Sequence, residues 1–243
     1  MASLYFAEAL TPEAFVVGGV ITITGEDARH ATQVARVRVG ERIKIGDGRG
    51  RTAAGTVVDA APGRVAIDVA EVEVIAPTVP AIRLVQALAK GDRDEMAVQA
   101  ATELGVSEVI PWAAARSVSR WEGAKAQRGR ARWATIAREA SKQSIRATVP
   151  LVSEIVTTAQ LSKADALVLV LDPAATELLS ATDLDGVETI TLVVGPEGGI
   201  DSREFEMLEA GGARRVKLGP EVLRTSTAGP AAIAALSIRL GRW

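Results

Sequence analysis

Two loops in the last third of the chain contain the residue types that hold a small ligand against the backbone. One loop, Gly195-Pro196-Glu197-Gly198-Gly199, follows the apolar run 189–194, and the other, Gly219-Pro220, follows the run 214–218. Glycine lets a ligand approach the main chain and proline restricts the loop, so backbone N–H and C=O groups are left facing a pocket. These groups suit an adenine ring or an amino-acid carboxylate.

A third loop of this kind, Leu171-Asp172-Pro173, ends the apolar run 166–171. If the three runs are neighbouring parallel strands, their carboxyl ends share one edge of the sheet, which is where open α/β sheets bind ligands. These junctions contain neither G-x-x-x-x-G-K-[S/T] nor G-x-G-x-x-G, which argues against a triphosphate or a dinucleotide. Plain tight turns are the alternative interpretation of the same glycines and prolines.

The composition excludes several kinds of chemistry. The 243 residues include no cysteine and a single histidine, His30, so we expect no disulfide, no thiolate nucleophile and no metal site. The apolar runs are shorter than the roughly 18 residues that a membrane span needs, and the first residues do not resemble a secretory signal. We therefore expect no membrane partner and a cytoplasmic location.

Charge is segregated along the chain although the net charge is only −2. Residues 116–146 carry a net charge of +7 and residues 29–51 carry +5, which leaves −14 for the rest of the chain. An ordinary solvated helix face explains so large an excess poorly. The pattern is typical of a protein that offers phosphate-binding surfaces and stays acidic elsewhere.

The spacing of apolar residues predicts two domains. Residues 1–73 alternate short runs rich in Val, Ile and Thr with Gly and Pro turns, which is typical of a small β-barrel or β-sandwich. After the proline-containing connector 74–82, residues 80–243 alternate strand-like runs with helical segments, which predicts an α/β domain with a mainly parallel sheet. The expected strands of that sheet are 82–88, 106–112, 166–171, 189–194 and 214–218.

Two helical segments carry further information. Segment 125–145 has apolar residues on one face and Arg and Lys residues on the opposite face. Segment 226–240 is apolar almost all round, so its own domain or a second subunit must cover it on several sides. We expect Pro230 to lie in the first turn of this segment, where a missing N–H costs little.

The two loop motifs also carry a resemblance to a known family. Gly195-Pro196-Glu197-Gly198-Gly199, followed by Leu218-Gly219-Pro220 and Leu223-Arg224-Thr225-x-Thr227-Ala228, resembles the RsmE family of 16S rRNA (uracil-N3) methyltransferases, which belong to the SPOUT superfamily. Lys90-Gly91-Asp92, Arg116-Ser117 and His30-x-x-x-Val34-x-Arg36-x-x-x-Gly40 also resemble family positions. The resemblance covers nearly the whole chain.

The resemblance implies S-adenosyl-L-methionine as the cofactor, a homodimer, a PUA-like β-barrel that grips RNA, and a deep trefoil knot in the carboxyl-terminal domain. It assigns to the cofactor site the residues Leu171, Asp172, Gly195, Pro196, Glu197, Gly198, Gly199, Leu218, Gly219, Pro220, Leu223, Thr225, Ser226 and Thr227. The sequence departs from the family pattern at Glu221 and Ser226, where Arg and Glu are common. Ser226 can act there only as a neutral hydrogen-bonding group.

The implied reaction needs a cation near the acceptor base. Methylation of uracil N3 removes an imide proton and spreads negative charge onto O2 and O4, which a cation stabilises. Our hypothesis is that Arg224 or Arg146 supplies this cation, with Glu197 as a candidate for handling the proton. Methylation of pyrimidine C5 commonly uses a thiolate, which this chain lacks.

The implied partner is 16S rRNA, within the small ribosomal subunit. N3 lies on the pairing edge of uracil, so the target base must be unpaired or extruded, and Trp121 is a candidate for stacking on it. We expect RNA contacts from His30, Arg36, Arg38, Lys90, Arg116, Arg120, Arg138, Lys142, Gln143 and Arg146. Two alternatives stay open: a SPOUT methyltransferase acting on ribose 2′-OH or on tRNA, and a non-catalytic RNA-binding module.

Overall fold

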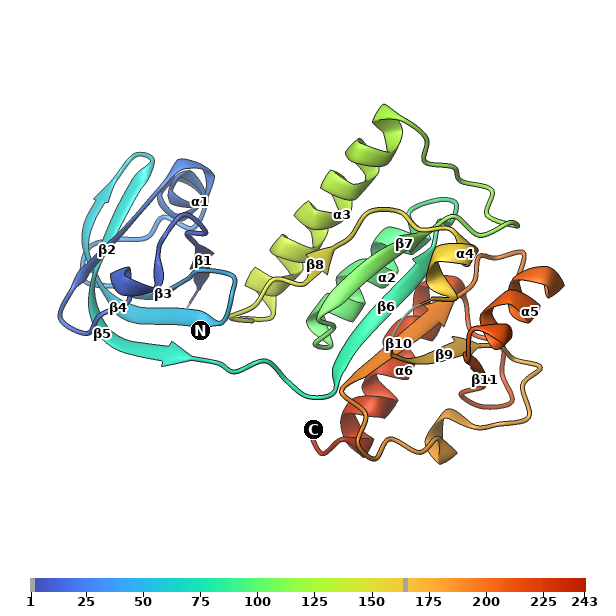
Figure 1. Cartoon of the computed structure of the whole chain (residues 1–243). Helices are drawn as coiled ribbons and strands as arrows, with labels where there is room; N and C mark the ends of the chain where they lie inside the picture. The colour runs from blue at the N-terminus through green and yellow to red at the C-terminus, as the bar shows by residue number, and fades with distance from the viewer. Residues whose placement is uncertain (1–2, 164–165) are drawn as a thin grey trace. The chain divides into compact units, whose positions relative to one another are not determined.

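The computed structural model describes residues 3–163 and 166–243 (Figure 1). Contacts within the chain divide it into two compact units. The first comprises the described residues up to Pro77 together with Ser141–Val149, and the second comprises the described residues of Thr78–Ala140 and Pro150–Trp243. The segment Ser141–Val149 therefore packs with the amino-terminal unit, although it lies well beyond the connector at 74–82.

The first unit contains a five-stranded sheet. Its strands lie in the order β1-β3-β4-β5-β2, where β1 is Leu4–Phe6, β2 is Val20–Thr24, β3 is Arg42–Gly46, β4 is Arg51–Ala61 and β5 is Arg64–Val74. β1 pairs with β3 in parallel, and the other pairs are antiparallel. Alternate residues of β2 and β5, namely Ile21, Ile23, Val65 and Ile67, are buried in one core, because successive side chains of a strand point to opposite faces.

Short helical segments join the strands of the first unit. A 3₁₀ turn, η1 (Pro12–Ala14), lies between β1 and β2, while α1 (Gly25–Arg29) and the π-helical turn η2 (His30–Val34) lie between β2 and β3. His30 is exposed at the start of η2. The aromatic ring of Tyr5 lies 6.3 Å from the His30 ring, measured between centroids.

Lys142 has a structural role in the first unit. Its Nζ lies 2.9 Å from Oδ1 of Asp27, and both side chains are buried. The other carboxylate oxygen of Asp27 accepts a hydrogen bond from the backbone N–H of Phe6 at 2.9 Å. This burial contradicts the prediction that Lys142 contacts RNA, because the ammonium group is not open to a phosphate.

The second unit contains a six-stranded sheet in which the strand pairs are parallel. The order is β11-β9-β10-β6-β7-β8, where β6 is Ala81–Ala87, β7 is Glu108–Trp112, β8 is Leu151–Val152, β9 is Leu167–Leu171, β10 is Thr189–Val194 and β11 is Arg214–Val216. The predicted α/β domain with a parallel sheet is confirmed. The two-residue strand β8 is too short to leave a pattern in the sequence, and β11 ends before Lys217 and Leu218, which join the following loop.

Helices of the second unit alternate with these strands. They are α2 (Arg93–Glu103), α3 (Ala124–Gln143), α4 (Thr158–Leu161), the 3₁₀ turn η3 (Leu179–Ala181), α5 (Ser202–Ala210) and α6 (Thr225–Arg239). α5 begins with a capping box in which Oδ1 of Asp201 accepts from the N–H of Arg203, and Oε2 of Glu204 accepts from the N–H of Asp201. α3 buries Trp133 and Ala137 in the core.

α6 packs against α2, β6 and β10 and buries Ala232, Ile233 and Leu236. Its own unit therefore covers this side of the helix, whereas Ile238 stays 63% exposed. The expectation that Pro230 lies in the first turn is wrong, because α6 begins at Thr225 and Pro230 falls in the second turn. The carbonyl of Ser226 consequently lacks the N–H that an ordinary residue at position 230 would donate.

Along residues 3–163 and 166–243, no helix combines the length and the apolar character needed to cross a membrane.

We predict that Lys142→Ala lowers the free energy of unfolding by about 3 kcal/mol, because it leaves the buried Asp27 carboxylate without its cation. The matched control is Arg42→Ala in the same unit, whose ion pair with Glu71 at 2.6 Å is exposed, and we expect a change below about 1 kcal/mol. Urea denaturation followed by circular dichroism measures both changes. Equal losses from the two substitutions would contradict the structural role of Lys142.

Candidate functional site

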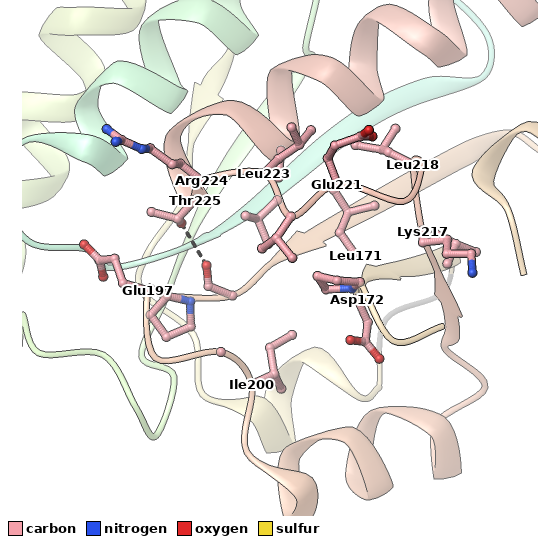
Figure 2. Close-up of a pocket in the computed structure, with 18 of the residues that line it drawn as sticks. Leu171, Asp172, Glu197, Ile200, Lys217, Leu218, Glu221, Leu223, Arg224 and Thr225 are labelled. Carbon is pink, nitrogen blue, oxygen red and sulfur yellow. Dashed lines mark hydrogen bonds between the residues drawn. The ribbon is translucent and has the colours of Figure 1, made fainter. Parts of the chain in front are cut away.

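The carboxyl ends of β9, β10 and β11 border a cavity of about 540 Å³ in the second unit (Figure 2). β9 pairs with both β10 and β11, so the three strands are neighbours, as the sequence predicts. The loops after them therefore meet at one edge of the sheet. The volume lies within the range of roughly 300–1,000 Å³ that small-molecule sites occupy.

Both apolar and charged residues line the cavity. The apolar lining consists of Leu171, Val194, Ile200, Phe205, Val216, Leu218, Val222, Leu223 and Ala228. The charged lining residues are Arg93, Asp172, Glu197, Lys217, Glu221 and Arg224. Such a lining suits a flat ring with hydrogen-bonding edges that carries a charged polar group.

The loop after β10 requires glycine at two positions. A Cβ atom on Gly195 would lie 2.6 Å from Cγ1 of Ile200, which is a clash. Gly199 has a φ of 72°, which an L-amino acid rarely adopts, and its N–H closes the turn on the carbonyl of Pro196 at 2.9 Å. At Gly198 a Cβ would lie 3.3 Å from Cβ of Arg116 and 3.5 Å from its carbonyl oxygen, which is a tight contact but a milder one than at Gly195. Gly195 and Gly199 therefore shape the cavity wall.

One hydrogen bond joins this loop to the start of α6. The hydroxyl of Thr225 donates to the carbonyl oxygen of Gly195 at 2.8 Å (Figure 2). Thr225 is buried and is the first residue of α6. The bond therefore holds the loops that follow β10 and β11 together at the wall of the cavity.

Glu197 is held by the turn that precedes α2. Its Oε1 accepts from the backbone N–H of Lys90 at 3.1 Å and from Nη1 of Arg93 at 2.9 Å. Burial opposes the ionisation of Glu197, but hydrogen bonds from its own N–H, from Lys90 and from Arg93 together lower the pKa of its carboxyl below the ordinary value. Glu197 is therefore a charged clamp between two loops, which makes it a poor proton acceptor.

Asp172 is also paired within the protein. Nε of Arg215 donates to Oδ2 of Asp172 at 2.8 Å, and the N–H of Ala174 donates to Oδ1 at 3.0 Å. The guanidinium carbon of Arg215 lies 4.4 Å from the centre of the Phe205 ring. The charge of Asp172 is thus balanced, and this residue contributes shape to the cavity.

Arg224 lies exposed at the rim of the cavity. Within the part of the chain that the structure describes, no acidic side chain forms an ion pair with it. Figure 2 shows the charged ends of Arg224 and Glu197 directed to the same side of the cavity, away from Leu171 and Asp172. The guanidinium of Arg224 is therefore open to a negatively charged partner at this side.

The structure brings together most of the residues that the resemblance assigns to the cofactor. Leu171, Asp172, Gly195, Pro196, Glu197, Gly199, Leu218, Gly219, Leu223 and Thr225 line the cavity. Gly198, Pro220, Ser226 and Thr227 belong to the same segments but are not among the residues that line it. Of the two departures from the family pattern, Glu221 lines the cavity and Ser226 does not.

Sequence reasoning missed several lining residues, of which Arg93, Phe205 and Lys217 bear most on the chemistry. Arg93 lies 104 residues before its partner Glu197, so no local motif marks it. Lys217 was assigned to the end of a strand. Its place two residues before the turn at Gly219-Pro220, inside the predicted strand 214–218, was the one signal that could have placed it in the loop.

The residues predicted to contact RNA are divided between the two units. In the first unit, His30, Arg36, Arg38 and Gln143 are exposed. Arg146 also belongs to the first unit, where burial lowers the pKa of its guanidinium to about 10, so that it stays protonated at neutral pH.

In the second unit, Lys90, Arg116 and Arg120 are exposed. Nη2 of Arg116 lies 3.0 Å from Oδ2 of Asp201, and the guanidinium of Arg120 donates to the carbonyls of Ala114 and Ala115. Arg138 is half-buried, and its Nη1 lies 3.4 Å from Oε1 of Glu139. Of these residues, Lys90 offers the charge that is most open to a phosphate.

The parallel sheet with a cavity at its carboxyl edge, in one chain with a small β unit, defines a two-unit α/β protein with a small-molecule site. A model of the RNA methyltransferase domain matches residues 77–237, and a model of the RNA methyltransferase PUA domain matches residues 23–70.

The similarity extends over whole relatives. Ribosomal RNA small subunit methyltransferase E of Mycobacterium bovis is 38% identical over 100% of this chain and 94% of its own length, and that of Bacillus subtilis is 32% identical over 96% and 95%. A crystal structure of the Neisseria gonorrhoeae ribosomal RNA small subunit methyltransferase E, bound to S-adenosyl methionine, has a TM-score of 0.87, 29% identity and 98% coverage of each chain. The chain belongs to the ribosomal RNA small subunit methyltransferase E family.

We predict that Glu197→Gln lowers the melting temperature at neutral pH and that this difference disappears in acid. A lowered folded-state pKa means that ionised Glu197 stabilises the fold above the pKa of an unfolded glutamate, about 4.3, and that this contribution is lost as the pH falls through the lower folded value. Scanning calorimetry of both proteins from about pH 7 to about pH 3 measures the difference. A difference in melting temperature that is absent at neutral pH, or that persists unchanged in acid, would contradict the role of ionised Glu197 as a clamp between the two loops.

Proposed function

We propose that this protein transfers a methyl group from S-adenosyl-L-methionine to N3 of a uracil in 16S rRNA of the small ribosomal subunit. The observation that carries the proposal is the cavity that three loops form at the carboxyl edge of the sheet. The proposal is also supported by the relatives named ribosomal RNA small subunit methyltransferase E, one of which has a structure with S-adenosyl methionine bound.

The residues of the cavity fit this cofactor. Ile200, Leu218 and Leu223, with the main chain of the glycine loops, would hold the adenine ring. Lys217 and Glu221 would meet the carboxylate and the ammonium group of the amino-acid portion. When bound, this cofactor supplies a methyl group on a positively charged sulfur, so transfer needs no covalent bond to the enzyme.

Arg224 is the residue that we assign to the acceptor base. Loss of the N3 proton leaves negative charge on O2 and O4 of uracil, and a cation beside these atoms stabilises the developing charge. Arg224 is at the rim of the cavity with an open guanidinium, whereas Arg93 and Arg215 are paired with Glu197 and Asp172. Arg146 belongs to the first unit, and we assign it to RNA binding.

The absence of cysteine from the sequence is consistent with methylation of a ring nitrogen and not of pyrimidine C5. A thiolate that adds to the pyrimidine ring is the common route to methylation at C5, and the chain contains no cysteine. Transfer to N3 needs alignment of the two reactants and removal of one proton. Rigid loops meet the first requirement. For the second, Arg224 stabilises the anion that N3 becomes, which makes N3 more acidic, and the proton leaves to water.

A second cavity, of about 330 Å³, supports RNA binding by the second unit. Lys90 and Trp121 line it, and the ring of Trp121 rests on Gly129 of α3, where a Cβ would lie 2.4 Å from Cε2 of the ring. Base stacking on an exposed aromatic ring is a general means of binding single-stranded RNA. Trp121 is half-buried, with its ring 5.0 Å from that of Trp133 between centroids, and we assign the accessible part of its ring to an unpaired base of the acceptor strand. We assign the PUA unit with Arg36 and Arg38 to the flanking RNA.

Our proposal also includes the assembly and the chain path. A homodimer would cover Val222 and Leu223, which are 75% and 37% exposed at the rim of the cavity. We also include the deep trefoil knot that the resemblance to the RsmE family implies for the carboxyl-terminal domain. The substrate places the enzyme in the cytoplasm.

The direct test is methylation of small-subunit RNA or of whole subunits by the purified protein, followed by digestion to nucleosides and mass spectrometry. We expect 3-methyluridine that depends on S-adenosylmethionine. A ribose-methylated nucleoside in its place would overturn the acceptor assignment. Cofactor binding without any methylated nucleoside from either substrate would favour a non-catalytic module.

We predict that Arg224→Ala lowers the rate of methylation by about 100-fold while the dissociation constant of the cofactor changes less than about twofold, because the cation acts on the acceptor. Arg224→Lys keeps the charge and should lose less activity. Arg203→Ala, which removes an exposed arginine of α5, is the control. A normal rate of methylation by Arg224→Ala would contradict the assignment of Arg224 to the acceptor base.

We predict that Gly195→Ala abolishes cofactor binding, because the added methyl would lie 2.6 Å from Cγ1 of Ile200 and would displace the cavity wall. Gly198→Ala in the same loop is the matched control, since its nearest contact is Cβ of Arg116 at 3.3 Å. Isothermal titration calorimetry with S-adenosylmethionine measures both. Similar affinity of the two variants would show that the loop is not a wall of the site.

A further inference from the structure

Gln86 has a buried amide side chain between two buried apolar residues of β6, Val85 and Ala87. It is 0% exposed and lies in β6, directly opposite Val194 in the register between β6 and β10. Val194 is the last residue before the loop that begins at Gly195. The sheet register therefore sets Gln86 beside the start of the cavity wall, although Gln86 is not one of the residues that line the cavity.

The amide of Gln86 fixes the hydroxyl of Thr225. Nε2 of Gln86 donates to Oγ1 of Thr225 at 2.9 Å, and it also donates to the carbonyl of Ala87 at 3.1 Å. An amide nitrogen can only donate, so the hydroxyl accepts this bond and its own proton is directed to the carbonyl of Gly195 at 2.8 Å. Gln86, Thr225 and Gly195 thus form a relay from the sheet to both loops of the cavity.

Fold stability alone does not account for Gln86. Its Oε1 is buried and has no hydrogen-bond partner among the described residues, and an unpaired buried acceptor lowers stability. An apolar side chain of similar length would fill the same space without this cost. The relay to Thr225 and Gly195 is the interaction that an apolar side chain could not make.

We propose that Gln86 is a positioning residue for the methyl-donor site, acting through Thr225 to hold the loop at Gly195 against the start of α6. This inference rests on the proposed function, because its measurable effect is on the binding of S-adenosylmethionine. Gln86 contacts neither the cofactor nor the acceptor in this account. Its loss loosens the wall of the cavity and leaves the sheet intact.

The first test is Gln86→Leu, measured by calorimetric titration with S-adenosylmethionine and by thermal unfolding. We expect the dissociation constant to rise roughly threefold to tenfold, which corresponds to one lost hydrogen bond, while the melting temperature stays the same or increases. Gln86→Met serves the same purpose if the branched side chain disturbs packing. A purely structural glutamine would give the opposite pattern, a lower melting temperature with unchanged affinity in the folded protein.

The matched control is Thr191→Val. Thr191 lies in β10, is 1% exposed, and its Oγ1 has no hydrogen-bond partner within the described part of the chain. The substitution removes a buried polar atom from the neighbouring strand without touching the relay, so affinity should not change. A loss of affinity equal to that of Gln86→Leu would mean that any polar change in the sheet weakens the site.

A double-mutant cycle tests whether Gln86 acts through Thr225. Thr225→Val should weaken binding, Thr225→Ser should preserve it, and Gln86→Leu should add little to Thr225→Val because the relay is already broken. If the two substitutions weakened cofactor binding additively, Gln86 would not act through Thr225 and the proposed relay would be wrong. If the unmodified protein does not bind S-adenosylmethionine, the proposed function fails; if it binds and Gln86→Leu and Gln86→Met bind equally well, only this inference fails.

Discussion

Parallel pairing of β9 with both β10 and β11 is the constraint on which the site depends. Parallel strands present their carboxyl ends at one edge, so the loops at 171–173, 195–200 and 217–224 meet there although they are far apart in the sequence. The same pairing of β10 with β6 brings Gln86 opposite Val194. The cavity is thus a consequence of strand order, and its residues are those that each strand places at its end.

Ion pairs determine which charged residues shape the site and which remain open for chemistry. Glu197 with Arg93 and Asp172 with Arg215 hold the loops in place, so neither carboxylate is suited to accept a proton. Arg224, at the same rim, is open to a partner. The site therefore supplies rigid walls that align the reactants and, at Arg224, an open cation that stabilises the base once its proton has left to water.

Much of this arrangement could be predicted from the sequence, because it depends on local signals. Apolar runs that end in glycine and proline marked β9, β10 and the loop after β11. What could not be predicted depends on tertiary contacts. Lys142 belongs to a basic segment, and only the fold shows that it is buried in an ion pair with Asp27. Arg93 and Gln86 belong to segments that carry no recognisable motif, so their contacts with the site could not be predicted. Pro230 lies in the second turn of α6 and not in the first, because α6 begins at Thr225.

We infer that the cavity at the carboxyl edge of β9, β10 and β11 holds the methyl donor. A crystal structure of the protein grown with S-adenosylmethionine tests it most directly. We expect density for the cofactor inside this cavity, in contact with the main chain of the loops after β10 and β11, and with the hydrogen bond between Thr225 and Gly195 intact. Cofactor bound elsewhere on the protein, with this cavity empty, would contradict it.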